Sequence, residues 1–244
     1  MDTHPLLKAT RMADYRHPDL QALIEREGWL GLATEEKIRA IHAHVRDAVK
    51  FGYNATDRLK ASDVYKQGYG QCNTKAVLLL ALLRAAGVPA RLRALDVESG
   101  FQKELVPKVF RPFMPKRFLH TQVLVEHEEK TRVLEGFILD RAYIEGVRRL
   151  ADTEKEPFIG YAVATESIRR PRIEFQGKDT AIQSLAVVHT HGDYDQPETL
   201  HEAHRQNLGF LRRSIYANIV RHFMNRRAKK IRRQKTEYNM TKTP

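Results

Sequence analysis

The most constraining feature of this sequence is a helix that is apolar on nearly every side. The stretch Asn73–Ala86 carries valine or leucine at six positions between 77 and 83. A helix with apolar side chains all round is stable in water only when other elements enclose it. A chain of 244 residues is long enough to build that enclosure. The sequence therefore predicts a central buried helix, ended by Gly87 and Pro89.

Helices precede strands in the order of the other predicted elements. Apolar residues recur at helical spacing in Thr34–Phe51, and polarity alternates along Arg91–Val97. The remaining predictions are helices at His17–Glu27 and Ser62–Gln67, strands at Leu119–Glu126, Thr131–Asp140 and Ile173–Val188, and a long helix that begins at Asp195. This order predicts an α+β fold in which helices pack on one side of an antiparallel sheet.

The basic charge of the chain is concentrated at one end. The formal net charge is +12, and residues 205–244 hold twelve basic residues against the single acid Glu237, or +11. We expect residues 1–200 to form one domain, residues 201–225 to form an amphipathic helix packed on it, and residues 226–244 to be a disordered basic tail. The predicted apolar stripe of that helix consists of Leu208, Leu211, Ile215, Ile219 and Phe223. An anionic partner, such as RNA, a membrane surface or an acidic protein, is the expected ligand of the tail.

A single cysteine excludes an internal disulfide framework and any metal site built from several cysteines. The first residues contain no apolar signal region, and no run approaches 18 apolar residues. These features predict a cytoplasmic protein. The segment His189–Asp195 holds metal-ligating residue types, but their spacing does not match helical zinc motifs. We therefore expect neither a metal nor a cofactor.

The lone cysteine, Cys72, begins the buried helix directly after Gly70 and Gln71. Unpaired backbone N–H groups and the positive end of the helix dipole favour the thiolate at this position. The tight glycine turn before it would let a substrate backbone approach. The alternative is a small buried hydrophobic residue, which is the usual role of an unpaired cysteine.

A nucleophilic cysteine needs a base, and the base needs a group that orients it. His120 lies at the start of one predicted strand, and Asp140 lies at the end of the next. In this interpretation the imidazole takes the proton of the thiol, and the carboxylate fixes the imidazole tautomer. Each residue alone is weak evidence, so the prediction depends on the ordered set of three.

The stretch from Ala61 to Arg91 resembles the nucleophile segment of the bacterial transglutaminase-like superfamily. The resemblance is strongest in Gly68-Tyr69-Gly70-Gln71-Cys72-Asn73-Thr74-Lys75. It implies a papain-like thiol fold with Cys72, His120 and Asp140 as the catalytic residues. It extends over about Ile38–Asp140.

Strand parity tests the third member of this set. If Glu128 and Glu129 form a two-residue hairpin loop, the numbers of paired residues sum to 257, so His120 opposes Phe137. Asp140 would then lie on the other face of the sheet. A triad with Asp140 therefore requires an odd loop or a bulge, and we expect the bulge at Gly136.

These residues predict a cysteine-dependent acyl-transfer enzyme that acts on amide or peptide bonds of a protein or peptide substrate, with hydrolysis preferred over amine crosslinking. The backbone N–H of Cys72 and the side chain of Gln67 or Gln71 are the candidate oxyanion donors. Phe101–Phe118 reads as a lid, and its candidate substrate-selecting cations are Lys108, Arg111, Lys116 and Arg117. The lid could equally be an ordinary solvated loop.

Two other functions fit the same sequence. The chain could be an inactive transglutaminase-like scaffold that binds a peptide or an anionic polymer. It could also be a basic-tailed protein that binds nucleic acid or a membrane, in which Cys72 is only structural.

Overall fold

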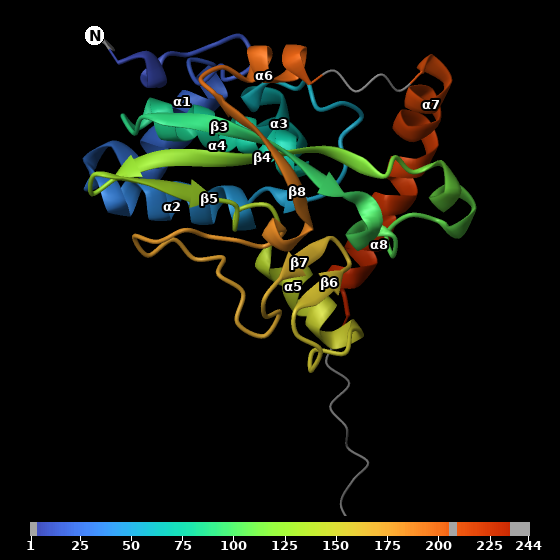
Figure 1. The fold of residues 1–244 in the computed structure, drawn as a ribbon. Coiled ribbons are helices and arrows are strands. Elements are labelled where there is room, and N and C mark those ends of the chain that lie inside the picture. The colour runs from blue at the N-terminus through green and yellow to red at the C-terminus, as the bar shows by residue number, and fades with distance from the viewer. Residues whose placement is uncertain (1–3, 205–208, 235–244) are drawn as a thin grey trace, which may run out of the picture.

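The computed structural model describes residues 4–204 and 209–234, and its α+β architecture confirms the predicted class (Figure 1). The helices are α1 Pro18–Glu27, α2 Thr34–Asp47, α3 Ala61–Gln67, α4 Cys72–Ala85, α5 Arg141–Leu150, α6 Pro197–Ala203, α7 Phe210–Ile215 and α8 Arg221–Arg232. The strands are β1 Lys50–Phe51, β2 Tyr69–Gly70, β3 Ala90–Glu98, β4 Arg117–His127, β5 Lys130–Leu134, β6 Phe158–Gly160, β7 Val163–Thr165 and β8 Val187–Tyr194.

The main sheet has four strands in the order β5-β4-β3-β8, and every neighbouring pair is antiparallel. Helix α4 packs against β3 and β4, and α2 and α3 pack against α4 in turn. Strands β1 and β2 form a short parallel pair, and β2 ends just before α4 begins. The pair therefore fixes the entry of the chain into the central helix.

Helix α4 is buried along its length, as its apolar sequence predicts. Its two charged residues are used inside the fold. Lys75 Nζ donates to the carbonyl oxygens of Val49 at 2.7 Å, Ile138 at 3.0 Å and Arg46 at 3.3 Å. Burial, opposed in part by Asp140, lowers the pKa of Lys75 to about 7. Lys75 thus joins α4 to the end of α2 and to the chain that follows β5.

Two predicted strands differ from the structure. The predicted strand Ile173–Val188 is mostly irregular, because β8 begins only at Val187. The predicted strand Thr131–Asp140 ends at Leu134, and residues 135–140 leave the sheet. The second difference matters for the site, because Glu135 and Asp140 both lie in the segment that leaves the sheet after β5.

The C-terminal segment also differs from its prediction. Helix α8 runs to Arg232, so residues 226–232 are helical and the expected disordered tail does not begin at 226. Its buried residues are Met224, Ala228 and Ile231, whereas Leu211, Ile219 and Phe223 of the predicted stripe are exposed. The packing face is therefore turned by one residue, about a quarter of a helical turn. Leu208 and residues 235–244 lie outside the described residues.

Helix α8 packs closely on α5. A Cβ atom added at Gly146 of α5 would lie 2.0 Å from the carbonyl oxygen of Ile231, so only glycine permits this approach. Within the described part of the chain, the helices all lack the length and apolar character needed to cross a membrane.

Candidate active site

Cys72 is the first residue of α4, as predicted from the sequence, and its side chain is buried. Gln71 caps the helix in an extended conformation, and its N–H donates to Thr74 Oγ1 at 3.1 Å. A Cβ atom at Gly70 would lie 2.6 Å from Thr74 Oγ1, so the tight approach before the cysteine needs glycine. The thiol donates a weak, long hydrogen bond to Asn73 Oδ1 at 3.6 Å.

His120 lies on β4, opposite Leu95 of β3, and its side chain is fully buried. Its Nε2 lies 2.8 Å from Glu135 Oε1, while its buried Nδ1 makes no strict hydrogen bond to the described residues. Burial acts to lower the pKa of His120, but the charges of Cys72 and Glu135 outweigh it and raise that pKa to about 10. The imidazolium form of His120 is thus favoured beside the Glu135 carboxylate.

Glu135 follows β5 directly and is fully buried. Its Oε2 accepts hydrogen bonds from the backbone N–H groups of Ile182 at 2.8 Å and Gln183 at 3.1 Å. Its own N–H donates to Thr180 Oγ1 at 2.9 Å. Although burial acts to raise the pKa of Glu135, His120 and the two N–H groups hold it below its ordinary value. Glu135 is therefore an ionised carboxylate in a fixed orientation.

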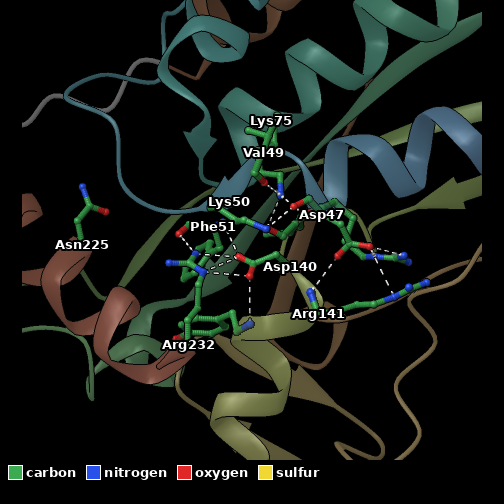
Figure 2. A network of polar contacts seen from close by, with 12 residues as sticks. Asp47, Val49, Lys50, Phe51, Lys75, Asp140, Arg141, Asn225 and Arg232 are labelled. Atoms are coloured by element: carbon green, nitrogen blue, oxygen red, sulfur yellow. Dashed lines mark hydrogen bonds and ion pairs between the residues drawn. The ribbon is translucent and has the colours of Figure 1, made fainter. Parts of the chain in front are cut away.

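Asp140, the predicted carboxylate, lies elsewhere in the structure (Figure 2). It caps α5 by accepting from the Tyr143 N–H at 3.1 Å, and it accepts from the Phe51 N–H at 2.9 Å. Arg232 of α8 donates to it through Nε, at 2.9 and 3.0 Å, and through Nη2 at 2.8 Å. The structure therefore pairs Asp140 with Arg232, and the predicted contact between Asp140 and His120 is wrong.

Asp140 does not contact His120 because the hairpin of β4 and β5 is regular. Glu128 and Glu129 both have positive φ, at 50° and 58°, and form a two-residue turn. The pairing keeps the sum of 257 from His127 and Lys130 to Val123 and Leu134, so no odd loop shifts the register. The expected bulge at Gly136 is therefore wrong. Glycine is needed at Gly136 for another reason, since a Cβ there would lie 2.6 Å from the Cα of Ile173.

The same arithmetic contains the signal that identifies Glu135. A sum of 257 places residue 135 opposite Gln122, which is two residues from His120 on the same face of the sheet. Gln122 Nε2 does donate to Glu135 Oε1, at 3.3 Å. The sequence analysis did not predict Glu135, because the family resemblance implies an aspartate and the matching position is Asp140.

The two candidate oxyanion donors are placed differently. Gln67 is exposed and its Oε1 accepts from Asn54 Nδ2 at 2.9 Å. Gln71 lines the cavity beside Cys72, and its Nε2 donates to Asp57 Oδ1 at 2.6 Å. Asn73 Nδ2 donates to the other oxygen of Asp57 at 3.0 Å. Asp57 therefore holds the side chains on both sides of Cys72, and of the two candidate residues only Gln71 lines the cavity.

Cys72 lies in the wall of a cavity of about 1110 Å³. The lid contributes apolar residues to this cavity, among them Phe110, Phe113 and Met114. Its four predicted selecting cations, Lys108, Arg111, Lys116 and Arg117, are not among the lining residues. Arg111 Nε donates instead to the carbonyl oxygen of Val106 at 3.2 Å.

Among the described residues, Glu35, His127 and Glu128 could hold a metal ion, because their ligand atoms lie within 4.8 Å of one another. None of the three lines the cavity at Cys72. In the predicted metal-like segment, His191 Nε2 pairs with Asp96 Oδ1 at 3.1 Å.

The class of protein is thus an α+β fold in which a cysteine begins a buried helix, and that helix packs on the antiparallel sheet that carries His120. Residues 30–104, the segment that contains Cys72, match the model of the transglutaminase-like superfamily. The matched segment ends before His120 and Glu135.

A solved structure of a proposed cysteine protease from Cytophaga hutchinsonii is also similar. It has a TM-score of 0.40 and 20% identity, over 53% of this chain and 39% of that chain. This chain therefore spans well under half of that protein. No curated protein gives a significant match.

Proposed function

We propose that this protein is a thiol hydrolase that cleaves an amide or peptide bond through Cys72, His120 and Glu135. The observation that supports the proposal is the fully buried His120 imidazole, whose Nε2 lies 2.8 Å from Glu135 Oε1 and whose pKa is raised by Cys72 and Glu135. A transglutaminase-like core around the cysteine supports the same reading.

In the proposed first step the thiolate of Cys72 attacks the carbonyl carbon of the substrate amide. A carbon–sulfur bond forms, and the carbonyl oxygen becomes an oxyanion near the Cys72 N–H at the start of α4. The imidazolium of His120 then gives its proton to the amide nitrogen. The carbon–nitrogen bond breaks, the amine leaves, and a thioester remains on Cys72.

In the second step water attacks the thioester carbonyl. Neutral His120 accepts a proton from the water, the carbon–sulfur bond breaks, and the carboxylic acid product leaves. The thiolate and the imidazolium are thereby restored. Glu135 keeps the imidazole oriented and stabilises its charged form in both steps, which is the role first expected of Asp140.

Alkylation and turnover together test this proposal. We expect iodoacetamide to alkylate Cys72 at pH 6.5 much faster than it alkylates free cysteine, and we expect His120→Asn to remove that difference. A mixture of fluorogenic acetyl-tripeptide aminomethylcoumarin amides should be hydrolysed by the wild type and not by Cys72→Ala. Slow alkylation together with no turnover would refute the proposal. Added glycine ethyl ester that captures most of the acyl group would show transamidation instead of hydrolysis.

The basic C-terminal segment supports no second function within the described residues. Arg232, one of its cations, is used inside the fold to bind Asp140. Binding of an anionic partner to the remainder of the tail stays a prediction. The four lid cations do not line the cavity at Cys72, so the lid does not support the predicted selection of acidic substrates.

A further inference from the structure

The cavity at Cys72 has walls from two segments that the family match does not reach. One wall is the second half of the lid, and the other is the C-terminal segment from α7 to α8. In Figure 1 the lid, in green, lies beside this segment, in red. The chain between α7 and α8 forms a π-helical turn, Tyr216–Val220, and three of its residues line the cavity. Such turns occur often at functional sites.

The side chains on both walls are mainly apolar. The lid contributes Phe110, Phe113 and Met114, and the C-terminal segment contributes Val220 and Met224. Phe113 is 66% exposed although it lines the cavity. An exposed aromatic side chain in a concave site gains free energy when an apolar ligand covers it. The cations on the C-terminal wall, Arg212 and Arg213, are exposed residues of α7.

Polar contacts fix the C-terminal wall to the body of the protein. Arg232 binds Asp140 and also donates to the carbonyl oxygen of Phe51 (Figure 2). Asn225, next to Met224, accepts from the Tyr53 N–H at 2.7 Å and donates to the Tyr53 carbonyl at 3.0 Å. The wall is thus tied to the strand and loop that lead toward Gln71.

From these contacts we infer that the cavity binds a peptide with bulky apolar side chains next to the scissile amide, and that the C-terminal helix is the wall that recognises them. Asp140 and Arg232 act as positioning residues, because they hold this wall and touch no reacting atom. The inference rests on the proposed hydrolase activity, whose substrate class it names.

A matched pair of substrates tests the inference. The probes are acetyl-Gly-Leu-Phe and acetyl-Gly-Ser-Asp, each as its aminomethylcoumarin amide. We expect kcat/KM to be about 100-fold higher for the apolar probe. Phe113→Ala should reduce this preference about tenfold through KM. Val109→Ala is the control, since Val109 is an exposed lid residue that does not line the cavity. Equal kcat/KM values for the two probes would overturn the inference.

Direct binding separates failure of the inference from failure of the proposed function. Fluorescein-labelled forms of the two peptides are titrated against Cys72→Ala and followed by anisotropy. The apolar peptide should bind at least tenfold more tightly, whether or not the wild type turns over. Equal binding would overturn the inference, while selective binding without any turnover by the wild type would refute only the hydrolase.

The positioning role has its own readout. Arg232→Gln should raise KM for the apolar probe about tenfold, leave the alkylation rate of Cys72 unchanged and leave KM for the acidic probe unchanged. Arg232→Lys should restore part of the loss. A general structural role would instead change the alkylation rate and both KM values together, and that result would overturn the assignment of Asp140 and Arg232.

Discussion

Two buried carboxylates, Glu135 and Asp140, lie close together in the sequence and have different cations as partners. Glu135 pairs with His120, whose imidazole can both donate and accept a proton. Asp140 pairs with Arg232, whose guanidinium stays charged throughout. One pair is therefore suited to proton transfer, and the other is suited to holding a helix in place. The partner of each carboxylate, more than its own chemistry, assigns the role.

The strongest test of these different roles is to neutralise each carboxylate in turn. Glu135→Gln should lower kcat by about 10³-fold or more, because the imidazolium loses its charge partner and its orientation. Asp140→Asn should change kcat by less than about tenfold. Steady-state hydrolysis of the apolar probe measures both. If the Asp140 variant lost as much kcat as the Glu135 variant, while remaining folded by circular dichroism, the assignment of roles would be reversed.

The ion pair of Asp140 and Arg232 should matter for the stability of the fold, which two arginine variants can test. Arg232→Gln leaves the buried Asp140 without the cation to which it is hydrogen-bonded, so we expect it to lower the free energy of unfolding by about 3 kcal/mol. Arg233→Gln is the matched control, because Arg233 is an exposed neighbour and its loss should cost less than about 0.5 kcal/mol. Urea unfolding compares the two. Equal stability of the two variants would mean that the Asp140 contact does not hold the C-terminal helix.

The two pairs should also affect stability at opposite ends of the pH range. The raised pKa of His120, about 10 in the fold, gives stability that is present below its ordinary value of 6.5 and is lost as pH rises toward 10. The lowered pKa of Asp140 gives stability that is present at neutral pH and is lost as pH falls into the acid range.

The alkaline loss can be isolated with a double variant. His120→Gln with Glu135→Gln removes both charges of the first pair and leaves Asp140 and Arg232 intact. Between pH 7 and 9 the wild type should lose about 2 kcal/mol relative to this variant. Thermal or urea unfolding over that range gives the difference. A constant difference would contradict the imidazolium assignment, as would an NMR titration in which His120 is neutral at pH 8.

The smallest expected effect concerns how closely the C-terminal helix approaches α5. Gly146→Ala should lower stability by about 1 to 2 kcal/mol, because the new Cβ would meet the Ile231 carbonyl. Gly31→Ala is the control, since no heavy atom lies within 4 Å of a Cβ built there. If the two alanine variants had the same melting temperature, the packing of α8 on α5 would be looser than this structure has it.

Residues close together in the sequence were enough to predict the buried core helix and the position of Cys72 at its start. The apolar residues around Asn73–Ala86 required a buried helix, and the helix start at Cys72 placed the thiol beside unpaired N–H groups. The position of the hairpin turn at Glu128 and Glu129 followed from residue spacing, although an odd loop or a bulge was expected with it. These features depend on neighbours within a few residues, which a sequence displays directly.

The identity of the carboxylate partner depended on tertiary structure. Residue numbering in a regular hairpin places Asp140 and His120 on opposite faces of the sheet, and this could be worked out from the sequence. The sequence did not show that Arg232, 92 residues away, would bind the Asp140 carboxylate. Similarly, the apolar pattern predicted a C-terminal helix but gave its packing face one residue out of phase, because contacts with α5 and Asp140 decide the rotation of α8. Local patterns follow from the chain itself, whereas these pairings follow from which distant groups the fold brings within hydrogen-bonding distance.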